Sequence, residues 1–138
     1  MKKILLAFAI GTASLLSFSS CTKEYVTNYL PGYSYVFPLS SGDWVKTADN
    51  TYEAVISMPE LDDVYYEDGH VNVAIQFENN VGTYYNVPAE NPGDRGHSYN
   101  AYYSVGKVYL KAFDLFTENV KPEAMRVKIV LTDAEIGN

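Results

Sequence analysis

The chain has 138 residues, 17 acidic and 10 basic side chains, a formal net charge of −7 and a single cysteine. This length suits one domain with a core of its own. The acidic surface repels phosphate groups, which argues against nucleic acid as a partner and against electrostatic docking to anionic lipid. Since one cysteine cannot form an internal disulfide, stability must come from packing.

The first 21 residues have the layout of a lipoprotein export signal. Lys2 and Lys3 precede an apolar stretch, Ile4–Phe18, which is short for a membrane span and is followed by small residues. Leu16-Ser17-Phe18-Ser19-Ser20-Cys21 resembles a bacterial lipobox, with a departure at the third position before the cysteine. We therefore predict a signal peptide over residues 1–20 and a lipid on Cys21. The mature chain then holds eight basic and 17 acidic side chains, a net charge of −9.

A tether and then a β-domain follow the cysteine. Residues 21–32 contain no periodic apolar pattern and end in Pro31-Gly32, so we interpret them as the tether. The domain is expected over residues 33–138. Seven of its segments have the composition or the alternation typical of strands. They are Ser34–Leu39, Tyr52–Met58, Val71–Phe77, Thr83–Val87, Ser98–Ser104, Val108–Ala112 and Met125–Leu131.

The clearest strand, Val71–Phe77, predicts one apolar face and one wet face, with Asn72 and Gln76 on the wet side. Turn residues at 79–82 and 105–106 predict two hairpins.

One helix is expected, over Pro59–Asp68, with Leu61, Val64 and Tyr65 on its apolar side. Ala89–His97 has no strand pattern and is predicted to be the longest loop. The fold class is therefore all-β: a single antiparallel β-sandwich, immunoglobulin-like, with about seven strands and one short helical crossing.

Several short motifs between roughly Asp43 and Leu131 resemble a known group of proteins. They are Met58-Pro59-Glu60-Leu61, Val64-Tyr65, Gly69 followed by Val71-Asn72-Val73, Val87-Pro88, and the closing segment Ala124-Met125-Arg126-Val127-Lys128-Ile129-Val130. This pattern is similar to that of small, uncharacterised lipoproteins of Bacteroidetes-type bacteria. The resemblance implies an immunoglobulin-like β-sandwich behind a lipid anchor, and it brings no catalytic residues.

Catalytic patterns are missing from the sequence. Nucleophilic catalysis needs a base beside its serine or cysteine, and the two histidines, His70 and His97, both fall in segments expected to be exposed turns or loops. No Gly-x-Ser-x-Gly occurs outside the signal, and the thiol of Cys21 is committed to lipid. No carboxylate pair can be singled out for glycoside hydrolysis. We predict that the protein is not an enzyme and uses no cofactor.

Carboxylates gather around the predicted helix. Oxygen-rich loops hold calcium, and Asp62, Asp63, Glu67 and Asp68 are the candidates, although their spacing differs from that of an EF-hand. The favoured interpretation is surface charge together with carboxylates that complement the start of the helix, so no metal site is predicted.

The 13 tyrosines all follow the signal segment, and three pairs of them are adjacent. Neighbours in a strand point to opposite faces, so each pair in a strand sends one ring outward. Aromatic rings beside amides suit glycan or protein recognition. The predicted ligand-binding residues are Tyr84, Asn86, Asn100 and Tyr102 on one sheet surface, with Trp44 as the lone indole. The alternative is ordinary cross-strand pairing on a half-covered sheet.

The sequence thus predicts a non-catalytic lipoprotein of the bacterial cell envelope, anchored to the outer membrane, that binds a glycan or a protein. The alternative is a structural or adhesin-like surface subunit that assembles through strand addition. Asp133–Asn138, after the last predicted strand, is too short and polar to be an obvious donor strand.

Overall fold

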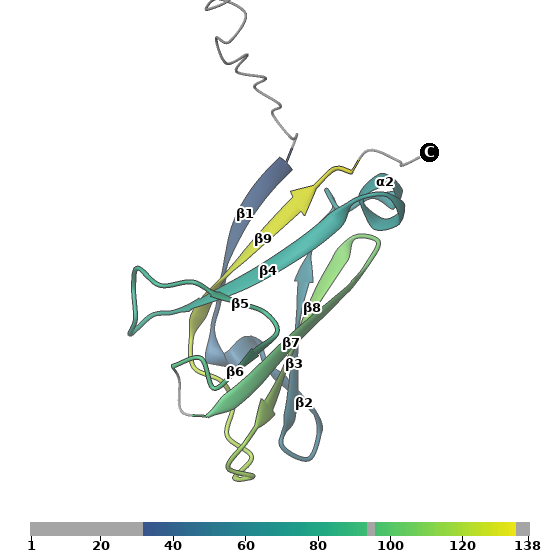
Figure 1. Ribbon diagram of the computed structural model, residues 1–138. Helices are drawn as coiled ribbons and strands as arrows, with labels where there is room; N and C mark the ends of the chain where they lie inside the picture. Colours follow the sequence, from purple (N-terminus) through teal and green to yellow (C-terminus); the bar gives the residue numbers. More distant parts are fainter. Residues whose placement is uncertain (1–31, 94–95, 135–138) are drawn as a thin grey trace, which may run out of the picture.

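The computed structural model describes residues 32–93 and 96–134. Within them the chain forms nine strands in two antiparallel sheets, which confirms the predicted all-β sandwich (Figure 1). The predicted signal peptide, Cys21 and the tether up to Pro31 lie outside the described residues. None of the described helices is long and apolar enough to cross a membrane.

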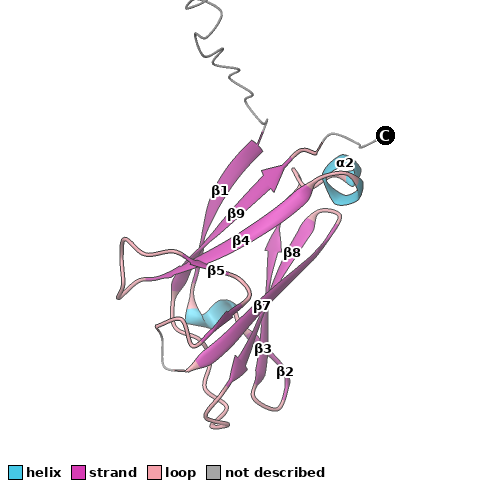
Figure 2. Cartoon of the chain, in the orientation of Figure 1, coloured by secondary structure: helices cyan, strands magenta, loops and turns pink. Residues whose placement is uncertain are grey.

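The two sheets contain four and five strands (Figure 2). The four-stranded sheet has the order β1 (Gly32–Leu39), β9 (Met125–Thr132), β4 (His70–Phe77) and β5 (Tyr85–Asn86). The five-stranded sheet has the order β2 (Val45–Ala48), β3 (Thr51–Ser57), β8 (Lys107–Asp114), β7 (His97–Ser104) and β6 (Ala89–Glu90). The short helices are η1 (Ser41–Asp43) and α2 (Asp63–Glu67).

The strand order follows that of an immunoglobulin domain, with two short edge strands added, β5 beside β4 and β6 beside β7, and with one substitution. β2-β3-β8-β7 follows the A-B-E-D order of one immunoglobulin sheet, and β4-β9 follows the C-F pair of the other. The place beside F, which the last strand G normally fills, is taken here by β1, the first strand of the chain. The sandwich is therefore completed by pairing the beginning of the domain with its end.

All seven predicted strands are present, and two short strands were missed. β2 has four exposed residues and therefore no apolar alternation that a sequence can display. β6 has two residues and lies inside the segment predicted to be a loop. Both predicted hairpins are confirmed, because β4 pairs with β5 and β7 pairs with β8. β1 begins at Gly32, two residues earlier than the predicted strand.

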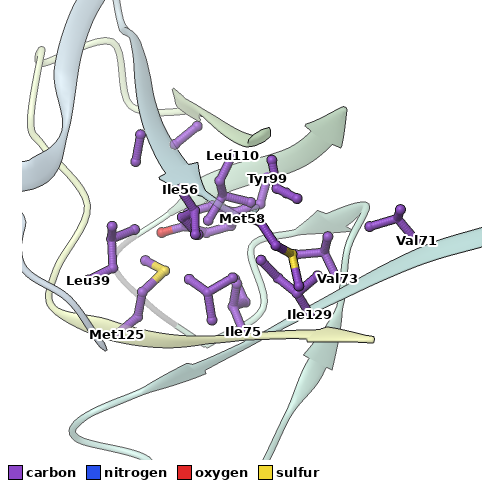
Figure 3. Close-up of a cluster of buried hydrophobic side chains, with 14 of the residues drawn as sticks. Leu39, Ile56, Met58, Val71, Val73, Ile75, Tyr99, Leu110, Met125 and Ile129 are labelled. Carbon is purple, nitrogen blue, oxygen red and sulfur yellow. The ribbon is translucent and has the colours of Figure 1, made fainter. Parts of the chain in front are cut away.

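The core lies between the sheets, where alternate side chains of the central strands meet (Figure 3). The predicted inward face of Val71–Phe77 is buried, as is that of Tyr52–Met58. The predicted wet face of β4 is partly wrong, because Ala74 and Gln76 are only 5% and 7% exposed. β4 is an inner strand, and Ala74 lies between Lys128 and Asn86 of its two neighbours.

The helical crossing is confirmed but shorter than predicted. The Asp62 carboxylate caps α2 by accepting hydrogen bonds from the backbone N–H groups of Val64 and Tyr65, at 3.0 and 3.1 Å. Leu61, just before the helix, is fully buried at the end of the core, whereas Val64 is 62% exposed. The predicted apolar side of the helix is therefore wrong at Val64, because one turn of helix presents little of its surface to the core.

The turn from α2 into β4 requires glycine at position 69. A Cβ on Gly69 would lie 2.9 Å from the backbone oxygens of Tyr65 and Thr132. Because backbone atoms cannot move aside like a flexible side chain, we expect Gly69→Ala to lower the free energy of unfolding by about 1–3 kcal/mol. Denaturant unfolding of residues 22–138, a form that retains every described strand, measures this.

The matched control is Gly42→Ala. The nearest atom that a Cβ at Gly42 would meet is the Ser40 hydroxyl oxygen, at 3.7 Å, so stability should change by less than about 0.5 kcal/mol. Equal losses in both variants would contradict the steric argument.

Candidate functional site

The outer face of the five-stranded sheet, which is turned away from the core, carries three rows of side chains across β3, β8 and β7. The tyrosine row is Val55, Tyr109 and Tyr102; the polar row is Glu53, Lys111 and Asn100; the phenylalanine row is Thr51, Phe113 and Ser98. Tyr102 and Phe113 are 47% and 40% exposed. Two rows that carry exposed rings therefore flank a row of charged and amide groups.

The tyrosine row is held rigid by two interactions. The rings of Tyr102 and Tyr109 are stacked in parallel, with centroids 4.6 Å apart and an interplanar angle of 2°. The Tyr102 hydroxyl donates a hydrogen bond to the Glu53 carboxylate. That bond, aided by desolvation and by the charge of Glu53, raises the pKa of Tyr102 to about 12. A ring fixed in this way loses little entropy when it contacts a ligand.

A hollow of about 480 Å³ opens beside the polar and phenylalanine rows. Apolar surface from Pro88, Phe113 and Leu115 forms part of its lining. The polar lining residues are Glu90, Ser98, Asn100 and Lys111. A mostly apolar lining with a few polar groups is typical of small-molecule sites. Of the predicted ligand-binding residues, Asn100 lines this hollow and Tyr102 stands in the neighbouring row.

The prediction of the site missed Tyr109, Lys111 and Phe113. All three lie on β8 at intervals of two residues and therefore share one face. Val108, Leu110 and Ala112 of the predicted strand are buried, so the alternation along this segment contained the outward placement of the residues between and after them. What the sequence did not show is that β8 lies beside the strand that carries Tyr102 and Asn100.

The hollow lies at the end of the sandwich opposite Gly32. Gly32 pairs with Thr132, and Thr132 pairs with His70, which follows α2. Phe113 pairs with Ser98 at the other end of the five-stranded sheet. In Figure 1 the start of β7 is accordingly far from the start of β1. The chain enters the sandwich at one end, and the hollow opens at the other.

The structure corrects the prediction of a single binding surface. Tyr84 precedes β5, and Asn86 lies within it, in the four-stranded sheet. Asn100 and Tyr102 lie on β7, in the other sheet. The two pairs are separated because the chain changes sheets between β5 and β6. Tyr84 is also engaged locally, since Lys128 Nζ lies 4.3 Å from the centroid of its ring.

Trp44 belongs to the core and not to a surface. Its side chain is 1% exposed, and its ring centroid lies 6.2 Å from that of Tyr99. The indole N–H is buried without a hydrogen-bond partner among the described residues. The predicted ligand-binding role of Trp44 is therefore wrong, because the side chain after η1 is directed between the sheets.

The carboxylates that were considered for calcium do not assemble into a site. Asp62 is engaged as the cap of α2, while Asp63, Glu67 and Asp68 are exposed. Across residues 32–93 and 96–134, no group of three aspartate, glutamate, histidine or cysteine side chains is placed to hold a metal ion. The interpretation as helix-start carboxylates is confirmed for Asp62.

His97 is buried, which corrects the expectation of an exposed loop histidine. It opens β7, pairs in register with Asp114, and is 1% exposed, as Asp114 is. Its Nε2 lies 2.8 Å from the backbone oxygen of Val120. The side chain therefore joins β7 to the loop that follows β8. His70 is exposed, as expected.

Asp114 organises that loop. Its carboxylate accepts hydrogen bonds from the backbone N–H groups of Phe116, Glu118 and Val120, at 3.0, 3.2 and 3.0 Å. Burial by itself raises the pKa of Asp114, but these three N–H groups and the nearby His97 stabilise the charged form and bring the pKa below its usual value. This buried charge therefore holds the loop after β8 in place, and Leu115 of that loop forms part of the wall of the hollow.

Comparisons with known proteins do not assign the chain to a family. No family model matches it, and no curated protein or solved structure matches it significantly. The resemblance to Bacteroidetes-type lipoproteins therefore stays a prediction.

Asp114→Asn should destabilise the fold and alter its response to acid. An amide replaces an oxygen that accepts N–H bonds, so we expect a loss of about 1–3 kcal/mol at neutral pH. Because the folded pKa is depressed, the contribution of Asp114 is present above the unfolded value of about 3.9 and is lost as the pH falls through the folded pKa. The variant should thus show a shallower acid slope in unfolding experiments between pH 7 and pH 2.

Asp49→Asn is the matched control. The Asp49 side chain is 91% exposed and forms an ion pair of 3.5 Å with Lys46, so the change should stay within about 0.5 kcal/mol. The role given to Asp114 is refuted if both variants unfold alike at every pH.

Proposed function

We propose that this protein is a non-catalytic, lipid-anchored binding module of the bacterial cell envelope, and that it recognises a glycan on the outer face of its five-stranded sheet. The observation that carries the proposal is the hollow of about 480 Å³ beside exposed rings and a polar row. Its position on regular strands gives the site a rigid backbone.

Sugars combine apolar C–H faces with hydroxyl groups, so a glycan site needs both rings and hydrogen-bonding groups. Phe113 and the tyrosine row supply the rings. The polar groups beside them are the Glu90 carboxylate, the Asn100 amide and the Lys111 ammonium group, which together supply hydrogen-bond acceptors and donors. A protein partner is the alternative, because exposed aromatic rings also serve protein interfaces.

The anchor and the site are compatible in space. Cys21 precedes Gly32 by 11 positions, and Gly32 lies at the end of the sandwich away from the hollow. A lipid on Cys21 would hold the domain at the membrane without placing the anchor at the binding face. The basic start and the apolar stretch before Cys21 support export and lipidation of this kind.

Binding can be tested by thermal unfolding of residues 22–138 against a panel of purified host and microbial glycans. A ligand at about 100 times its dissociation constant should stabilise the fold by about 2.7 kcal/mol, which raises the melting temperature measurably. Phe113→Ala should abolish the shift because it removes part of the apolar wall of the hollow. Lys111→Ala should abolish it because it removes a hydrogen-bond donor.

Tyr84→Ala is the matched control, since it removes a partly exposed ring from the opposite sheet. It should keep the full shift. A panel without any saturable shift, or equal loss in Tyr84→Ala and Phe113→Ala, would count against glycan recognition on this face. A flat panel would favour the protein alternative.

Lipidation is tested separately with the full chain in a bacterium that processes lipoproteins. The wild-type chain should incorporate a labelled fatty acid and sediment with membranes, whereas Cys21→Ser should do neither, because the lipid is attached through the thiol of Cys21. Adding Ser41→Cys to Cys21→Ser controls for position and should not restore the label. Labelling that persists in Cys21→Ser would show that the anchor lies elsewhere.

A further inference from the structure

Of the four edge strands in the described part of the chain, three carry features that hinder pairing with another chain. β5 and β6 have only two residues each. β2 has four residues, a lysine at Lys46 and a register shift between Lys46 and Ala48. Short strands, lysines and bulges are the usual protections of a sheet edge.

β1 is the exception. It has eight residues, Gly32–Leu39, with the sequence GYSYVFPL, and none of them is charged. All eight pair with β9 in an unbroken register, so no bulge twists the strand away. Pro38, which lacks an N–H group, stands next to the last position and blocks only that end. Among the described residues, the other side of β1 has no neighbouring strand.

The side chains of β1 also leave apolar surface uncovered at this edge. Tyr33, Tyr35 and Phe37 lie on one side of the strand in a continuous row, with successive centroids 6.5 and 6.4 Å apart. Their pairing with the buried Leu131, Ile129 and Val127 places them on the inner face of the sheet. Tyr33 is nevertheless 55% exposed, and on the outer face Val36 is 50% exposed. The edge of the sandwich is thus an aromatic strip beside unpaired backbone.

The form of the edge favours a second copy of this chain as the partner, because an antiparallel ladder needs a second long, regular and uncharged edge, and a second copy brings one. With 17 acidic against 10 basic side chains, two copies repel each other over most of their surface. An uncharged edge eight residues long lets two copies approach without opposing carboxylates. We propose that the β1 edges of two copies pair antiparallel across a twofold axis and join the two four-stranded sheets into one continuous sheet.

This geometry gives a closed dimer. A twofold contact uses the same surface on both copies, whereas a filament needs two different edges that fit each other. The other three edges are short or protected, so the described strands offer a filament no second long edge. The structure therefore points to a pair, in contrast to the polymer considered from the sequence. The binding face on the other sheet stays free in both copies.

The membrane tether permits such a pair. Antiparallel pairing with the axis at Tyr35 places the two Gly32 residues near opposite ends of the joined strands, about 20 Å apart along them. The 11 residues from Cys21 to Pro31 span at most about 36–40 Å when extended. Two anchored copies can therefore pair with their strands lying along the membrane.

The test uses residues 22–138, which contain every described strand and no cysteine. Light scattering over a concentration series should show the monomer mass changing to twice that value and no further. Val36→Lys should weaken the dimer at least tenfold, because it places two like charges at the joined edge. Circular dichroism and thermal unfolding confirm that the variant is folded.

Val45→Lys is the matched control, since Val45 is 65% exposed on the edge strand β2 of the other sheet. It should leave the dimer intact. Single cysteines at Ser34, Tyr35 and Val36 test the axis directly, because a residue lies opposite its own copy only where the axis passes: at least one of Ser34→Cys, Tyr35→Cys and Val36→Cys should form a disulfide-linked dimer under mild oxidation, and Val45→Cys should not.

Three results would overturn the proposal. They are a wild-type mass that stays monomeric up to about 1 mM, masses that grow beyond the dimer, and equal weakening by Val36→Lys and Val45→Lys. None of these results bears on glycan binding, which involves the opposite sheet.

Discussion

The apolar layer between the two sheets is the constraint on which the rest of the structure depends. β4 and β9 supply one side of this layer, and β3 and β8 supply the other. In each of these strands, every second side chain is buried in the layer. A shift of one residue in any of these strands would move its whole apolar set to solvent. The register is therefore fixed by burial, and the register in turn decides which side chains stand together on the outer faces.

The strand order explains why the beginning of the domain matters as much as its end. β1 fills the position beside β9 that the last strand fills in an ordinary immunoglobulin domain. The ladder between β1 and β9 spans the full length of both strands. It joins the two ends of the domain, so its formation closes a loop of nearly the whole domain and costs chain entropy. The same position leaves β1 at the edge of its sheet. Its side chains carry no charge, and no described strand covers its outer backbone, so this edge is suited to pairing with a second copy.

The outer faces of the two sheets have different characters. On the four-stranded sheet, Lys128 lies over Tyr84, so the exposed aromatic ring is already paired with a cation. On the five-stranded sheet, Tyr102 and Phe113 stand on either side of the polar row, and the loop held by Asp114 adds Leu115 to the wall of the hollow. Rings, polar groups and concavity, which are the features of a small-molecule site, therefore coincide on the five-stranded sheet.

The sequence by itself determined the class of fold, because alternation in segments such as Val71–Phe77 and the turns between strands are local signals. It also contained the outward placement of Lys111 and, in principle, of Phe113. Only the tertiary structure decided which strands are neighbours: it moved Tyr84 and Tyr102 to opposite sheets and buried Trp44 and His97. Sheet pairing depends on contacts between residues far apart in the chain, and local periodicity carries no record of them.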